Sequence, residues 1–149
     1  MKTIKKLKID ELCKKFIPLT DDEIRKLMGG WYCFSYCMNY IGTDGARFEH
    51  YYDSIYGSSQ SNGGVSSSYV ESALNYAGIS YMSYDGQSLP SIQPNGRQIV
   101  TINNNTHAVI YEGFYKDNNN NTMIKYYDPQ TGLRENYQVT GGSISMIGF

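Results

Sequence analysis

Three residues of this chain have the types needed for nucleophilic chemistry: Cys33, His107 and Asp128. A cysteine at the start of a buried helix lies at the positive end of the helix dipole, which favours the nucleophilic thiolate. A histidine on a facing strand can pair with that thiolate and later protonate a leaving amine. A carboxylate on the next strand can fix the imidazole tautomer. The residues therefore predict a nucleophile, a base and acid, and an orienting aspartate.

The segment between His107 and Asp128 predicts that these two side chains meet. Residues 107–115 and 122–128 are rich in β-branched and aromatic side chains, and the Asn-rich segment 116–122 between them is typical of a hairpin loop. In the register that this loop predicts, positions 107 and 128 lie close to opposite one another. Cross-strand neighbours have Cβ atoms roughly 4.5–5.5 Å apart, which is within reach of a side-chain hydrogen bond.

Other interpretations of the same residues stay open. The spacing of Cys33, Cys37 and His50 partly matches a zinc-finger pattern, and the distant His107 would have to be the fourth ligand. Cys33 and Cys37, on neighbouring helical turns, could form a disulfide in an oxidising compartment. Both cysteines could also be packed as small apolar residues, with the histidine satisfied inside the hairpin. Cys37 is a second candidate for the nucleophile.

Length and charge place these residues in one domain behind a distinct N-terminal segment. A chain of 149 residues is enough for one ordinary domain, and its net charge of −1 argues against a nucleic-acid partner. Residues 1–30 carry eight Lys and Arg and five acids, a net charge of +3, which leaves −4 for residues 31–149. None of the fifteen tyrosines lies in the first thirty residues. Two kinds of composition therefore meet at Gly29-Gly30.

The periodicity of residues 31–149 changes half-way from helical to extended. Apolar spacing and glycine stops predict helices over residues 33–42, 46–57 and 68–78. The second half holds short β-branched and aromatic runs between Pro, Gly and Asn residues, which predict strands at 79–84, 97–102, 107–115, 122–128, 134–139 and 143–149. Helices followed by an antiparallel sheet make an α+β domain.

The N-terminal segment resembles the double-glycine leader of bacterial exported peptides, most closely in "LTDDEIRKLMGG", residues 19–30. That resemblance implies a peptidase-containing ABC transporter as a partner and cleavage after Gly30, with Gly29 and Gly30 fitting a cleft too narrow for side chains. The mature protein would be residues 31–149, secreted without insertion into a membrane. The alternative is an amphipathic N-terminal helix that packs on the domain and ends at a glycine cap.

Most of residues 31–149 resembles papain-like bacterial cysteine peptidases of the bacteriocin-processing, double-glycine type. "HAVIYEGF" at 107–114 and "IKYYDPQTG" at 124–132 are similar to the His strand and Asp-Pro turn of that family, and "CFSYCMNYIG" at 33–42 is similar to its nucleophile helix. The resemblance implies a papain-like fold with N-terminal helices packed on a C-terminal antiparallel sheet. It also implies a Cys33, His107 and Asp128 triad that hydrolyses peptide or protein substrates without a cofactor or metal.

One departure from the family concerns the oxyanion hole. The family carries a Gln about six residues before the catalytic Cys, whereas position 27 is Leu and no Gln occurs before Cys33. Loss of one oxyanion donor typically costs ~10²–10³ in rate. The alternative function is therefore a non-enzymatic secreted effector or bacteriocin-like protein with a degenerate peptidase fold. The abundance of Tyr, Ser, Gly and Asn suits such an adaptable binding surface.

Overall fold

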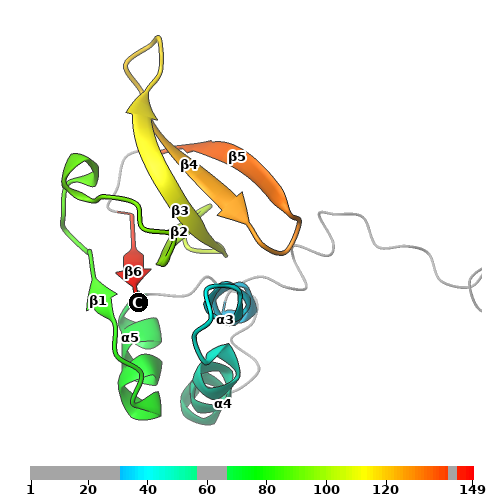
Figure 1. The fold of residues 1–149 in the computed structure, drawn as a ribbon. Helices are drawn as coiled ribbons and strands as arrows, with labels where there is room; N and C mark the ends of the chain where they lie inside the picture. The colour runs from blue at the N-terminus through cyan, green and yellow to red at the C-terminus, as the bar shows by residue number, and fades with distance from the viewer. Residues whose placement is uncertain (1–30, 57–66, 141–143) are drawn as a thin grey trace, which may run out of the picture.

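Three helices precede six strands in the described part of the chain, which covers residues 31–56, 67–140 and 144–149 of a computed structural model. The strands form one antiparallel sheet, and the helices pack against it, so the predicted α+β class is confirmed (Figure 1). The predicted leader, with its cleavage site at Gly29 and Gly30, lies outside the described residues.

The helices are α3 (Trp31–Tyr40), α4 (Gly45–Tyr56) and α5 (Ser67–Ala77). Helices α3 and α5 are followed by left-handed glycines, Gly42 at φ 77° and Gly78 at φ 66°, as the sequence predicts. Helix α3 begins two residues earlier than expected, and Cys33 still lies in its first turn.

The six strands match the predicted runs closely except at the β1 end of the sheet, where β1 and β6 are shorter than predicted. Their bounds are β1 (Met82–Ser83), β2 (Gln98–Ile102), β3 (His107–Lys116), β4 (Thr122–Asp128), β5 (Leu133–Gln138) and β6 (Met146–Gly148). Their order across the sheet is β1-β6-β2-β3-β4-β5. The C-terminal strand β6 therefore pairs with β2 and separates it from β1.

The predicted register of the β3–β4 hairpin is wrong by two residues at the start of β3 and by three next to the loop. Tyr111 pairs with Tyr126, and the register shifts by one residue at a bulge between Tyr111 and Gly113. Continued to the start of β3, this register would set position 107 opposite 130 rather than 128. Side chains alternate faces with a period of two, so a two-residue shift keeps positions 107 and 128 on one face as diagonal neighbours.

The sheet separates two apolar clusters. On β3, Ala108 and Ile110 belong to a helix-facing cluster with buried side chains of all three helices, whereas Val109 and Tyr111 belong to a second cluster with Ile124 of β4. Because both faces of its first half are covered, β3 is buried from His107 to Tyr111. A strand buried on both faces is held firmly, and His107 is its first residue.

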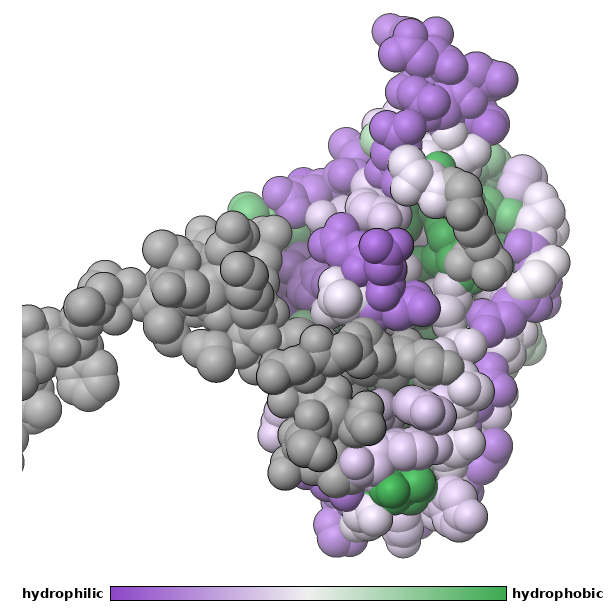
Figure 2. All heavy atoms as spheres, turned by 180° about the vertical axis from the view of Figure 1, so that it is seen from behind, coloured by the Kyte–Doolittle hydropathy of each residue, from purple (hydrophilic) through white to green (hydrophobic). Residues whose placement is uncertain are grey.

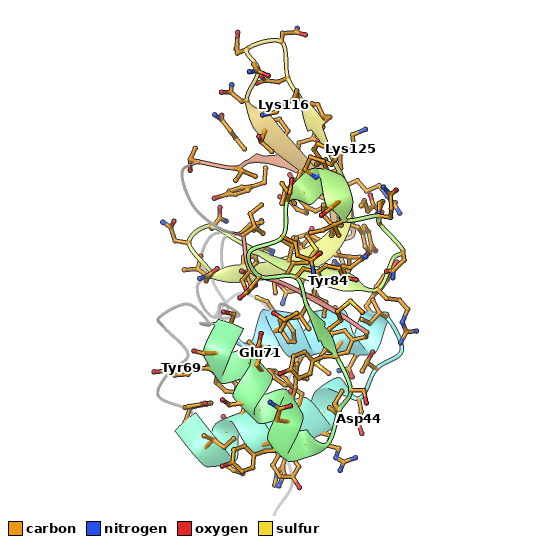
Figure 3. All side chains as sticks on the ribbon, turned by 90° about the vertical axis from the view of Figure 1, so that its left-hand side faces the viewer. Asp44, Tyr69, Glu71, Tyr84, Lys116 and Lys125 are labelled. Atoms are coloured by element: carbon orange, nitrogen blue, oxygen red, sulfur yellow. The ribbon has the colours of Figure 1, made fainter. Side chains whose placement is uncertain are left out.

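The hydrophilic end of the molecule lies away from the helices. Figure 2 shows hydrophilic side chains gathered on the projecting tip of the β3–β4 hairpin, where Asn118, Asn119 and Asn120 are exposed. In Figure 3, Lys116 and Lys125 lie toward this end, whereas Tyr69 and Glu71 lie on α5. Among the described helices, none is long and apolar enough to cross a membrane.

Candidate active site

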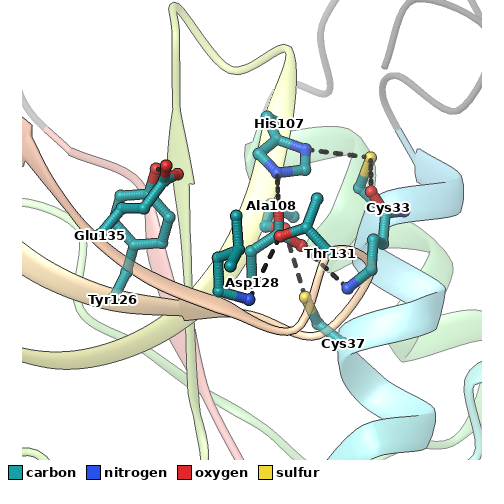
Figure 4. A network of polar contacts seen from close by, with 10 residues as sticks. Cys33, Cys37, His107, Ala108, Tyr126, Asp128, Thr131 and Glu135 are labelled. Atoms are coloured by element: carbon teal, nitrogen blue, oxygen red, sulfur yellow. Dashed lines mark hydrogen bonds and ion pairs between the residues drawn. The ribbon is translucent and has the colours of Figure 1, made fainter. Parts of the chain in front are cut away.

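Cys33, His107 and Asp128 meet where the first turn of α3 approaches the β3–β4 pair (Figure 4). Nδ1 of His107 lies 3.3 Å from Sγ of Cys33, and Nε2 lies 2.9 Å from Oδ2 of Asp128. The side chains of all three residues are buried, with Cys33 0% and Asp128 1% exposed. The imidazole thus bridges a thiol and a carboxylate in a largely water-free setting.

A tight asparagine turn sets the position of His107. Asn103, Asn104 and Asn105 all have left-handed φ values, between 52° and 64°, which Asn tolerates better than most residues. The hydroxyl of Thr106 donates a 2.7 Å hydrogen bond to the carbonyl of Asn103 and closes the turn. The turn reverses the chain between β2 and β3, so that β3 begins at His107.

A second turn holds Asp128 at the end of β4. Pro129 has no N–H to donate to the ladder, and the Gly132 N–H donates a 2.8 Å hydrogen bond to the Asp128 carbonyl. The Gln130 N–H donates a 2.9 Å hydrogen bond to Oδ1 of Asp128. Oδ1 is therefore held by the turn, and Oδ2 accepts from His107.

The charges of the site favour an imidazolium between two acceptors. Burial lowers the pKa of His107, but hydrogen bonds from the ring to Asp128 and Cys33 outweigh it and raise the pKa from 6.5 to about 9. Burial raises the pKa of Asp128, but its hydrogen bond from His107 and the nearby positive charge reverse this and lower the pKa below 3.8. At neutral pH the pair is therefore an imidazolium and a carboxylate.

This raised pKa predicts a pH dependence of stability. Below about pH 6.5 His107 carries its proton in both folded and unfolded chains, so the stabilisation is fully present. Between 6.5 and about 9 only the folded chain keeps the proton. In Cys33→Ala, which has no thiol proton to lose on folding, the free energy of unfolding should therefore fall across this window, because the Asp128 carboxylate still holds the imidazolium. Urea unfolding of this variant at pH 6.5 and pH 9 measures the fall, and the same variant with His107→Ala should not show it.

Cys37 is set apart from the imidazole. Its thiol is fully buried one helical turn beyond Cys33, and it donates a 3.3 Å hydrogen bond to the Ala108 carbonyl (Figure 4). Burial, and then the proximity of Cys33 and Asp128, raise the pKa of Cys37 well above 9.0. Both cysteines are thiols and not a disulfide. The geometry therefore favours Cys33 over Cys37 as nucleophile.

The predicted zinc ligands are not brought together. His50 is exposed on α4, where its ring contacts Tyr51. Within residues 31–56, 67–140 and 144–149, no three His, Cys, Asp or Glu side chains form a group that could hold a metal ion. The histidine of the candidate site uses both ring nitrogens for Cys33 and Asp128 instead.

No protein-family model, curated protein or solved structure matches this chain.

A cavity of about 270 Å³ lies on the far side of the sheet from the helices. Its wall is apolar and includes Tyr84, Leu89, Ile92, Val139, Ile144 and Met146. None of the three candidate site residues lines it. A substrate carbonyl would therefore have to reach Cys33 through an opening other than this cavity.

One residue at the site has no predicted role. Gln130 follows Asp128 in the turn, and its Oε1 lies 3.5 Å from Sγ of Cys33. The predicted register does not bring Gln130 to the site, because it places position 128 close to opposite 107. The observed register, continued past the end of β4, would set position 130 opposite 107. The signal that could have found Gln130 is the correct register of the hairpin.

Proposed function

We propose that this chain is a papain-like cysteine peptidase in which Cys33 is the nucleophile, His107 the base and acid, and Asp128 the orienting residue. The observation that carries the proposal is the contact of both imidazole nitrogens, Nδ1 with the Cys33 sulfur at 3.3 Å and Nε2 with the Asp128 carboxylate at 2.9 Å. These are the contacts that an activated cysteine needs.

The proposed reaction begins from an ion pair of the Cys33 thiolate and the His107 imidazolium, in which Nδ1 holds the former thiol proton. The thiolate attacks the peptide carbonyl carbon, the electron pair of the carbonyl moves onto oxygen, and the tetrahedral intermediate then expels the amine. The imidazolium protonates that amine, leaving a thioester on Cys33. Water gives a proton to His107, attacks the thioester and releases the acid, which restores the ion pair. The Asp128 carboxylate accepts a hydrogen bond from Nε2–H of His107 throughout and so fixes the orientation of the ring.

The proposed peptidase is made with a double-glycine leader, residues 1–30, and exported by a peptidase-containing ABC transporter that cuts after Gly30. Cys33 is fully buried in the 149-residue chain, so substrate access requires an opening close to position 33. Cleavage after Gly30 would leave Trp31 as the new N-terminus, two positions before Cys33. The intact mass of protein from the culture medium tests export, and a species beginning at Met1 would contradict it.

Alkylation by iodoacetamide at pH 6 tests the proposed ion pair. An ordinary thiol, with a pKa near 8.5, is less than about 1% thiolate at that pH. We expect Cys33 to be alkylated far faster than an ordinary thiol at this pH, because protonated His107 holds the Cys33 thiolate. His107→Ala should slow the reaction about 10²-fold at pH 6. The full chain and residues 31–149 are measured side by side, with peptide mapping to separate Cys33 from Cys13 and Cys37.

Two cysteine variants complete this measurement. Cys33→Ala should remove the fast reaction, and Cys37→Ala should retain it, because the Cys37 thiol faces the Ala108 carbonyl and not the imidazole. Alkylation that is equally fast in wild type and His107→Ala would overturn the proposal.

A second candidate function is a secreted, non-enzymatic binding protein. It is favoured by large exposed tyrosines on two helices, Tyr32, Tyr36 and Tyr40 along one side of α3 and Tyr69 and Tyr76 on α5. Tyrosine supplies large contact area at low cost in conformational entropy. The same alkylation experiment separates the two functions, since a binding protein has no need of a His107-dependent thiolate.

A further inference from the structure

The side-chain amide of Gln130 lies beside the sulfur of Cys33, and only one end of this amide has a hydrogen-bond partner among the described residues. Its Oε1 lies 3.5 Å from Sγ of Cys33. Its Nε2 is buried, and within the described part of the chain it has no hydrogen-bond partner. A buried donor left without an acceptor is destabilising. An unpaired donor beside the candidate nucleophile is free to form a hydrogen bond to an atom that becomes an acceptor during the reaction.

The position of Gln130 is tied to that of the candidate triad. The Gln130 N–H donates to Oδ1 of Asp128, and Oδ2 of the same carboxylate accepts from His107. The turn after β4 therefore fixes both the carboxylate that orients the imidazole and the amide at the sulfur. The backbone of Gln130 is therefore held beside the candidate triad, and its side-chain amide has only to turn about its own torsion to change the end that it presents.

The chemistry of the sulfur decides which end of the amide it prefers. In the neutral state the Cys33 thiol donates to Oε1 of Gln130. After the proton moves to His107, the sulfur is an anion with nothing to donate, and a carbonyl oxygen beside it is repelled. A half-turn of the amide about its last side-chain torsion exchanges the two ends and presents Nε2–H₂ to the negative charge.

We propose that Gln130 is a catalytic residue whose Nε2–H₂ donates to the oxyanion formed when Cys33 attacks a carbonyl. This inference rests on the proposed peptidase function. In the tetrahedral intermediate the oxyanion lies two bonds from Sγ, in the space that the Gln130 amide borders. The resembled family supplies this donor from a Gln before the nucleophile, where this chain has Leu27. Here the donor comes from the turn that follows β4.

The test compares acyl transfer with alkylation in Gln130→Ala and Gln130→Met. Met keeps a side chain of similar length without a donor. Acyl transfer is followed with p-nitrophenyl acetate and fluorescein-labelled casein, and alkylation with iodoacetamide. We expect both variants to lose ~10²–10³ in hydrolysis of casein. Their alkylation at pH 6 should fall much less than their hydrolysis of casein, because displacement at a saturated carbon forms no oxyanion.

Gln138→Ala is the matched control, since Gln138 is exposed at the end of β5, and it should match wild type in both reactions. Thermal unfolding of each variant reports folding separately. Wild-type rates of hydrolysis in the Gln130 variants would overturn the role of Gln130 and leave the peptidase proposal standing. Equal losses of alkylation and hydrolysis would make Gln130 a positioning residue for Cys33. A wild-type chain that hydrolyses neither probe, in full-length or 31–149 form, would overturn both proposals.

Discussion

Replacing His107 with alanine is expected to lower hydrolysis of fluorescein-labelled casein by roughly 10⁴–10⁶-fold, the range found when one member of a catalytic unit is removed. The expectation follows from the two contacts of the ring, because no other described side chain bridges Cys33 and Asp128. Without the imidazole the thiol has no base at attack, and the leaving amine has no acid at collapse. The measurement is the initial rate of hydrolysis at pH 7 with substrate well below saturation.

The chain supplies its own control for this experiment. It contains only two histidines, and His50 is exposed on α4. His50→Ala should hydrolyse casein at the wild-type rate. Added imidazole should restore part of the activity of His107→Ala, since the truncated side chain leaves room beside the sulfur. A His107→Ala protein that stays folded and retains more than a tenth of wild-type activity would remove His107 from the mechanism.

Replacing Gly45 with alanine is expected to cost about 3 kcal/mol of unfolding free energy, at the upper end of what overpacking costs. Gly45 is the first residue of α4 and lies against α3. A Cβ at this position would stand 2.2 Å from the Ser35 carbonyl oxygen and 2.7 Å from Oδ1 of Asn39. The Ser35 oxygen belongs to the backbone of α3, so relief requires one helix to move. Urea unfolding monitored by circular dichroism measures the loss.

Gly86→Ala is the matched control for Gly45→Ala. A Cβ on Gly86 would meet no atom within 4 Å, but its φ is 79°. Its cost should be the strain of a left-handed residue alone, about 1–2 kcal/mol. Gly45→Ala should also slow alkylation of Cys33, because α3 carries both Ser35 and the nucleophile. If both substitutions cost the same free energy, the close approach of α3 and α4 does not limit substitution at Gly45.

The elements of this fold follow from local signals. Helix ends at Gly42 and Gly78 could be predicted because a left-handed residue after a helix strongly favours glycine. The strands of the hairpin were recognisable from β-branched and aromatic runs on either side of an Asn-rich loop. The length of the edge strand β1 was less predictable. A strand was predicted over residues 79–84, but only Met82 and Ser83 form β1, because β6 pairs with these two residues alone.

The register of the hairpin could not be predicted from the loop alone. The error begins at the loop: Lys116 pairs with Thr122, so the hairpin is centred on position 119, later in the chain than the predicted register places it. The bulge between Tyr111 and Gly113 inserts a residue into β3 and reduces the error by one. The meeting of His107 and Asp128 survived the error because a shift of two preserves the face. The same error concealed Gln130, which the observed register, continued past the end of β4, would set opposite 107.

By itself the sequence determined which residues have the chemistry of the site and on which elements they lie: a cysteine in the first turn of a helix, a histidine opening one strand and an aspartate ending the next. These are local properties, set by side-chain period, glycine and proline. Only the tertiary structure decided that Cys33 rather than Cys37 faces the imidazole, and that a glutamine beyond the aspartate reaches the sulfur. Both depend on how α3 is packed across β3 and on the strand register, which are set by contacts between residues far apart in the chain.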